Sequence, residues 1–162
     1  MKYSIKTALL MIFSMGLCSC LAIVPVDVVM VDDELFFVLE EPAKIEFVRV
    51  SVAKAAPGSV SKAFWLLGDA STPKYLKLSQ IHYGKKYDGF SWVEGPFPLQ
   101  KNIECLVEIN MPGKFANEVF VITDDNKVVM PHPTFERQKG RTYSVSVDKD
   151  GNKTLILEPA SK

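Results

Sequence analysis

The hydrophobic and polar positions follow two different patterns along the chain. From Thr7 to Leu17 the residues are almost continuously apolar. This run is about a dozen residues long, whereas a helix needs about twenty apolar residues to cross a bilayer. Further along, short apolar runs, several of them alternating with polar residues, recur about every 8 to 15 residues. The first pattern is typical of the core of an export signal, and the second predicts a series of β-strands.

Turn residues separate the predicted strands. Asp32-Asp33 divides the first two strands, residues 28–31 and 35–39, and Glu41-Pro42 is expected to end the second. The apolar phase changes near Val48, which predicts either a bulge in the strand over 44–52 or burial of both of its faces. The clearest hairpin joins 143–147 to 154–157, because Tyr143, Val145 and Val147 alternate there with serines. The other predicted strands are 63–67, 75–78, 81–83, 101–111, 118–122 and 128–130.

The strand pattern predicts an all-β fold with one domain. Since no stretch after the apolar run has helical periodicity, we expect a small antiparallel β-sandwich of the immunoglobulin-like kind. Trp65 lies one strand after a strand predicted to be central, as the core tryptophan of such sandwiches does, although their paired cysteines are missing. A chain of 162 residues is long enough for one hydrophobic core and too short for two typical ones.

Charge and cysteine content exclude several classes of protein. The 19 basic residues balance the 19 acidic ones, so no electrostatic case exists for nucleic-acid binding. Two of the three cysteines lie in the first twenty residues, which excludes a disulfide framework. The remaining cysteine, Cys105, shares one strand face with Val107 and Ile109 and is therefore expected to be buried.

Candidate catalytic chemistry is sparse. The two histidines, His82 and His132, lie far apart in the sequence, at no spacing typical of a zinc site or a catalytic triad. The turn after Asp148 resembles a calcium loop only superficially, since its sixth position is Lys153 rather than glycine. We therefore expect no metal and no cofactor, and predict a binding protein rather than an enzyme.

Residues 83–97 form the most irregular and most aromatic stretch. Glycines and prolines alternate there with aromatic residues, lysines and carboxylates. Aromatic side chains flanked by charges are typical of protein interfaces, but the same side chains could instead close one end of the sandwich. Both interpretations stay open, with the closing role favoured. The candidate partner-binding residues are Tyr83, Tyr87, Phe90 and Trp92.

A second motif concerns the cellular location of the protein. Leu17-Cys18-Ser19-Cys20 resembles the lipobox of bacterial lipoproteins. The resemblance implies a signal peptide over 1–19 and lipidation of Cys20 with palmitate among the acyl groups. Together with the strand pattern it predicts a tether over 20–26 and a β-sandwich domain over 27–162. Leu21 follows Cys20, which in such lipoproteins favours the periplasmic side of the outer membrane over the inner membrane. An ordinary cleaved secretory signal is the alternative.

The mature sequence is similar in places to small type VI secretion immunity lipoproteins of Gram-negative bacteria. The similarity lies in spaced glycine, proline and aromatic residues: 81–84, Gly89-Phe90, 96–99, 107–109 and 143–145. It implies a periplasmic protein that inhibits a secreted toxin by binding it. The main alternative is a structural or assembly lipoprotein of the cell envelope with a permanent protein partner. A lipid-anchored hydrolase or small-solute binder would need a convergent polar pocket, which the sequence does not indicate.

Overall fold

The structure is a computed structural model that describes residues 21–54, 62–68 and 75–159. The predicted signal peptide and Cys20 lie outside these residues. Within them the chain forms twelve strands and one short 3-10 helix, η1 (Glu136–Gln138), so the predicted all-β sandwich is confirmed. No helix in the described part is long and apolar enough to cross a membrane.

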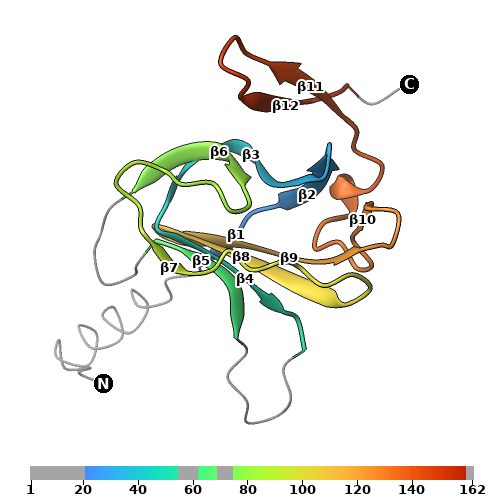
Figure 1. The fold of residues 1–162 in the computed structure, drawn as a ribbon, viewed down its shortest axis with the longest axis horizontal. Helices are drawn as coiled ribbons and strands as arrows, with labels where there is room; N and C mark the ends of the chain where they lie inside the picture. The colour runs from blue at the N-terminus through green and yellow to red at the C-terminus, as the bar shows by residue number, and fades with distance from the viewer. Residues whose placement is uncertain (1–20, 55–61, 69–74, 160–162) are drawn as a thin grey trace, which may run out of the picture.

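The strands form three sheets that are stacked as layers (Figure 1). The first sheet contains β1 (Ala22–Ile23), β4 (Phe47–Val52), β5 (Ala63–Leu67), β7 (Trp92–Glu94), β8 (Glu104–Met111), β9 (Lys114–Ile122) and β10 (Val128–Val129). The middle sheet contains β2 (Val26–Val31), β3 (Glu34–Ile45) and β6 (Leu76–His82). The third is a hairpin of β11 (Tyr143–Val147) and β12 (Lys153–Leu157). The hairpin covers the outer face of the middle sheet.

The strand order of the two larger sheets is immunoglobulin-like. In the middle sheet the order β2-β3-β6 matches strands A, B and E of that fold, and β4-β8-β9 in the first sheet matches C, F and G. Trp65 is fully buried, but it lies on β5, beside the strand that carries the core tryptophan in immunoglobulins. The comparison made from the sequence therefore holds for the sandwich and fails for the position of this tryptophan.

The main core lies between the first and middle sheets. On β8 the buried residues alternate with partly exposed ones, as one face of a strand requires. Phe37 of β3 meets Phe120 of β9 edge-on across the core, with ring centroids 6.0 Å apart. Trp65 meets Tyr83 in the same way at 5.1 Å. These aromatic contacts join the two sheets into one sandwich.

The apolar run of β3 is buried on both faces because β3 lies in the middle layer. Leu35, Phe37 and Leu39 belong to the main core, whereas Phe36 and Val38 form a second, smaller cluster on the opposite face. The hairpin supplies the buried Leu155 of that second cluster. An uninterrupted apolar segment, rather than an alternating one, is what two-sided burial requires.

Several predicted strand boundaries are wrong. Pro42 does not end β3, which continues to Ile45, because the register with β6 shifts between Val38 and Ala43 and proline is tolerated at such an irregularity. The chain then turns at Glu46 into β4, so the predicted strand over 44–52 is divided between two strands of different sheets. The change of apolar phase marks this crossing instead of a bulge. The predicted segments 75–78 and 81–83 form the single strand β6.

The segment predicted as a tether, residues 20–26, is folded over most of its described part. β1 pairs in parallel with the start of β9, and the Val24 amide donates to the Phe115 carbonyl at 2.9 Å. Val26 is fully buried and begins β2. The domain therefore begins before the predicted boundary at residue 27, because backbone hydrogen bonds to β9 hold residues that the sequence pattern alone leaves unassigned.

Cys105 is buried in the main core, as predicted. Burial raises the pKa of its thiol to about 11. At pH 8 about one thiol in a thousand is then ionised, and reagents that attack thiolates must also reach a buried sulfur. We expect Ellman's reagent to leave Cys105 unmodified in the native protein and to react with it within minutes once the protein is unfolded in about 6 M guanidinium. Fast modification of the native protein would contradict the buried position.

Candidate protein-binding site

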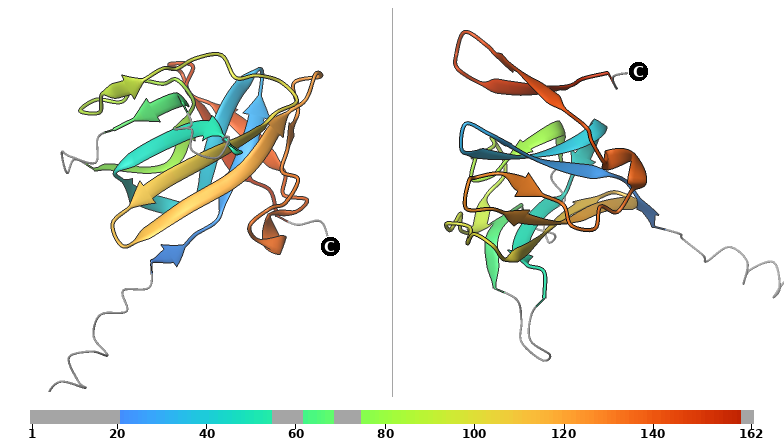
Figure 2. Two further views of the ribbon diagram at one scale, coloured as in Figure 1. Left: turned by 90° about the horizontal axis from the view of Figure 1, so that it is seen from below. Right: turned by 90° about the vertical axis from the view of Figure 1, so that its right-hand side faces the viewer.

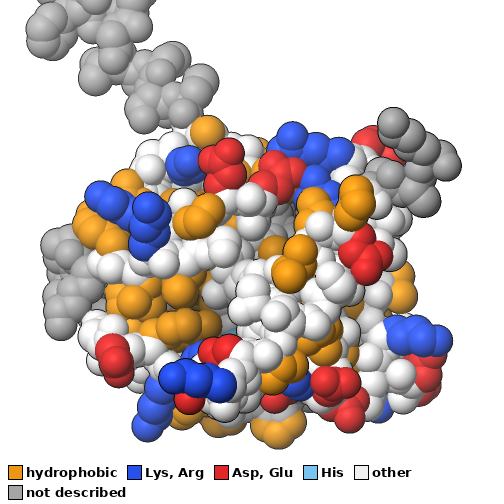
Figure 3. Space-filling view, turned by 90° about the horizontal axis from the view of Figure 1, so that it is seen from above, with side chains coloured by type: hydrophobic (Ala, Val, Ile, Leu, Met, Phe, Trp, Pro, Cys, Tyr) orange, Lys and Arg blue, Asp and Glu red, His pale blue; other side chains and the backbone are white. Residues whose placement is uncertain are grey.

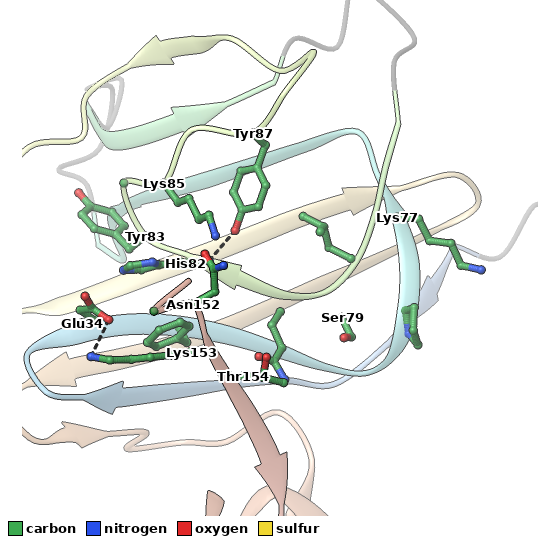
Figure 4. A pocket seen from close by; sticks show the side chains of 16 residues that line it. Glu34, Lys77, Ser79, His82, Tyr83, Lys85, Tyr87, Asn152, Lys153 and Thr154 are labelled. Carbon is green, nitrogen blue, oxygen red and sulfur yellow. Dashed lines mark hydrogen bonds and ion pairs between the residues drawn. The ribbon is translucent and has the colours of Figure 1, made fainter. Parts of the chain in front are cut away.

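A cleft of about 700 Å³ lies between β6, the loop that follows it and the β11–β12 hairpin turn. Figure 4 shows the side chains that line it. The cleft extends along β6, since its lining takes in every residue from Lys77 to Gln80 and then His82. Gly151 to Thr154 line it on the hairpin side. Two segments far apart in the sequence, residues 77–87 and residues 151–154, therefore enclose it together with residues of β3.

Two of the four predicted binding residues, Tyr83 and Tyr87, line this cleft. The Tyr87 hydroxyl accepts a hydrogen bond from the His82 amide at 2.9 Å. The Tyr83 hydroxyl donates to the Phe97 carbonyl at 2.6 Å, which ties the beginning of the loop to its end. Burial raises the pKa of both phenols, so both stay protonated and can donate hydrogen bonds at neutral pH.

The other two predicted residues, Phe90 and Trp92, are absent from the lining of the cleft. Phe90 packs over Gly68, where a Cβ would lie 2.7 Å from its ring and 2.5 Å from the Glu46 carbonyl. The Trp92 indole donates to the Lys85 carbonyl at 3.2 Å, and the Lys86 ammonium lies 4.9 Å from its ring centroid. All four aromatic residues pack against the main core while remaining partly exposed. They have the contacts expected of a lid, and their role in binding stays a prediction.

The charges around the cleft are mostly positive. Its lining holds Lys77, Lys85 and Lys153 against one carboxylate, Glu34, which gives 3 − 1 = +2 with His82 neutral. Lys153 pairs with Glu34 at 2.9 Å and with Asp32 at 3.1 Å. Within the described part of the chain, Lys77 and Lys85 have no carboxylate partner, and both are exposed.

His82 lies at one end of the cleft and stacks on Phe36, with ring centroids 4.6 Å apart. Burial lowers the pKa of His82, and this effect exceeds the opposing attraction of Glu34. The imidazole is therefore neutral at pH 7, and the cations of the cleft are its lysines. His132 lies elsewhere and is exposed. Among the described residues no three side chains of the types His, Cys, Asp and Glu gather as a metal site would require.

The hairpin wall of the cleft is held in place by the Gln80 side chain, which makes the hydrogen bonds that a neighbouring strand backbone would make. The Gln80 amide group bonds Leu155 twice: its Nε2 donates to the Leu155 carbonyl, and its Oε1 accepts from the Leu155 amide at 2.9 Å. This pair of bonds is the pattern of two neighbouring strands in a ladder. It holds β12 above β6 and leaves the cleft open beside the contact.

A buried polar cluster holds the segment that leads into the hairpin. Asp27, buried in β2, accepts hydrogen bonds from Gln138 at 3.0 Å, from Arg141 at 2.8 Å and from the Tyr143 hydroxyl. Arg141 also pairs with Glu40 of β3. Burial alone would lower the pKa of Arg141, but its hydrogen bonds to Asp27 and Glu40 outweigh burial and raise it. The guanidinium is therefore always charged and always paired.

The hairpin itself exposes apolar side chains. Val145, Val147 and Leu157 share the strand face that carries the buried Leu155, yet they are 39%, 58% and 46% exposed. The middle sheet therefore covers this face only in part. Figure 3, seen from the hairpin side, shows hydrophobic side chains gathered in patches with charged side chains between and around them.

The sequence indicated the loop wall of the cleft but not the hairpin wall. Aromatic content marked Tyr83 and Tyr87, whereas Gln80, Asn152 and Lys153 lie in patterns typical of ordinary strands and turns. The pairing of Gln80 with Leu155, two residues 75 positions apart, and the packing of Leu155 on Phe36 and Val38 bring these segments together. No local sequence signal encodes such a contact.

Comparisons of the chain with protein-family models, with curated proteins and with solved structures give no match.

Proposed function

We propose that this protein is a lipid-anchored binding domain on the periplasmic side of a bacterial membrane, and that it acts as an immunity protein by binding a secreted toxin. The observation that carries the binding role is the cleft, in which Tyr83 and Tyr87 of the aromatic loop lie beside Lys77 and Lys85, two lysines without a carboxylate partner among the described residues. Tyrosine and flanking charge supply contact area and electrostatic steering in protein interfaces.

The position of β1 supports the anchored arrangement. A lipid on Cys20 would be followed after one residue by β1, so the sandwich would sit directly against the membrane surface. In the right-hand view of Figure 2, β1 and the β11–β12 hairpin lie at opposite corners of the molecule. An anchor at the β1 end would therefore leave the hairpin side, which carries the cleft, directed toward a partner in the periplasm.

The anchor is tested by replacing Cys20 with alanine. We expect complete loss of radioactive palmitate incorporation and release of the protein from the membrane fraction, because the thioether needs the sulfur. Cys18→Ala is the matched control, since the lipobox places the lipid on Cys20 alone, and it should leave labelling and membrane retention unchanged. Unchanged labelling of the Cys20→Ala variant would overturn the anchored arrangement.

The immunity role is tested with the protein encoded by the gene next to the gene of this protein, which is the candidate toxin. A toxin directed to the periplasm should kill cells that lack this protein and spare cells that express it, and the two proteins should form a stoichiometric complex. Failure to protect, together with an envelope defect in cells without any toxin, would favour a structural or assembly subunit of the envelope instead.

A further inference from the structure

Strand β11 pairs with β12 in a regular antiparallel ladder. The five residue pairs of the two strands follow one another without a register shift. At the ends of this ladder the Glu158 amide donates to the Thr142 carbonyl at 2.9 Å, and the Asp148 amide donates to the Asn152 carbonyl at 3.1 Å. Every second residue of such a ladder bonds to the neighbouring strand. The even-numbered residues of β11 therefore face β12, and the backbones of its odd-numbered residues point away from it.

The two outer edges of the hairpin differ in their hydrogen bonds. On β12 the outward-facing backbone of Leu155 bonds to the Gln80 side chain, which agrees with the alternation and occupies that edge. On β11 the outward backbone groups of Tyr143, Val145 and Val147 have no hydrogen-bond partner within the described part of the chain. The hairpin is the outermost layer of the molecule (Figure 1). β11 therefore presents a free and accessible strand edge.

The free edge carries apolar side chains and no charge. Charged side chains, above all lysine, keep edge strands from pairing with other chains, and β11 contains none. Val145 and Val147 are exposed, although they lie on the strand face that contains the buried Leu155. Of the ten large apolar side chains that are exposed among the described residues, four belong to this hairpin. Since a two-stranded hairpin is only marginally stable alone, further strands beside β11 would stabilise it.

The sequence of β11 is complementary to itself. When two copies of the strand run antiparallel and are centred on Val145, this residue lies opposite its own copy, and Tyr143 lies opposite Val147 on the same apolar face. Ser144 then lies opposite Ser146 on the other face. The odd-numbered residues, whose backbones are free, meet one another as hydrogen-bonded pairs. This register pairs all five residues and places no charge between the two strands.

We propose that two copies of this chain form a symmetric dimer through β11, in which the two hairpins make one four-stranded sheet of order β12-β11-β11-β12. The two-fold axis of an antiparallel strand pair is perpendicular to the sheet and keeps each face on its own side. Both sandwiches then lie on the same side of the shared sheet, because each hairpin turns the face with Leu155 toward its own sandwich. This arrangement suits two copies anchored in one membrane.

The dimer goes beyond the proposed function and leaves its site free. The cleft is lined by Lys153 and Thr154 of β12 and by no residue of β11. It lies beside the edge that Gln80 occupies, which is the edge opposite to the proposed contact. Pairing through β11 needs no toxin and would therefore occur whether or not the protein confers immunity.

A cysteine at the symmetry axis tests the register. Full-length Val145→Cys protein is oxidised with copper phenanthroline in isolated membranes and run on a non-reducing gel. We expect a disulfide-linked dimer, since opposite residues of a hydrogen-bonded pair have Cα atoms about 5.5 Å apart, within the reach of a disulfide. Val147→Cys is the matched control, because its two copies would lie about 14 Å apart along the strands. Cross-linking no stronger than that of Val147→Cys would overturn the proposal.

Charges at the axis test the contact without a disulfide. Two differently tagged full-length copies are purified with detergent micelles in large excess over protein, so that copies share a micelle only when bound. Val145→Lys in both copies should lower co-purification at least tenfold, because like charges meet across the axis. Val145→Asp should do the same, and one copy of each should restore the complex, which excludes a folding defect as the cause. Val145→Thr keeps the shape of valine and should bind normally. No co-purification of wild-type copies, or no recovery in the mixed pair, would overturn the dimer.

Discussion

Replacing Asp27 with alanine is expected to lower the free energy of unfolding by about 3–5 kcal/mol, the usual cost of removing one partner of a buried ion pair. The Asp27 side chain is 3% exposed and that of Arg141 is 15% exposed, so water cannot replace the lost carboxylate. The change also removes the acceptor of the Gln138 and Tyr143 hydrogen bonds. Urea denaturation followed by far-ultraviolet circular dichroism measures the effect.

The contrast with less disruptive changes tests the physical cause. Asp88→Ala removes an exposed carboxylate from the loop and should change the free energy of unfolding by less than about 0.5 kcal/mol. Combining Asp27→Ala with Arg141→Met should recover part of the loss, because the second change removes a largely buried guanidinium that has lost one of its two carboxylate partners. A loss below about 1 kcal/mol for Asp27→Ala would mean that the cluster contributes little to stability.

This cluster also shows what sequence patterns leave out. Val26-Asp27-Val28 places a carboxylate inside an apolar strand, and Arg141 lies in a glycine-containing connection more than a hundred residues later. Each residue alone is typical of a surface, where charged side chains are most often found. Their burial follows only from the fold, which brings η1 and β2 together.

The strands themselves were predictable wherever one face is buried. β8 in its burial and β11 in its sequence have the period of two that a strand with one apolar face requires. β3 and β4 were divided wrongly because both faces of β3 are buried and Pro42 occupies an irregular position in it. Periodicity carries no information there, and the hairpin that covers the outer face of β3 lies far away in the sequence.

The cleft was predictable in part for a similar reason. Aromatic residues of the loop are a local signal, and two of them do line the cleft. Its other wall depends on how the hairpin lies over β6, which is set by Gln80 and by the second apolar cluster. The position of β6 at the edge of the middle sheet is likewise a property of the strand order rather than of the residues in β6.

The three-layer arrangement predicts different results for two adjacent phenylalanines of β3. Phe37→Ala removes a fully buried ring from the main core and should cost about 3–5 kcal/mol of unfolding free energy. Hydrogen exchange should then accelerate in all three sheets, since global unfolding becomes easier.

Phe36→Ala removes a ring from the smaller cluster beneath the hairpin. The Leu155 amide donates a hydrogen bond to the Gln80 side chain. Phe36→Ala should accelerate hydrogen exchange of this amide at least tenfold more than exchange of the amides in β8. Equal acceleration in β8 and β12 for both variants would mean that the hairpin and the sandwich unfold as one unit, whereas the separate clusters on the two faces of β3 predict that the hairpin can detach while the sandwich stays folded.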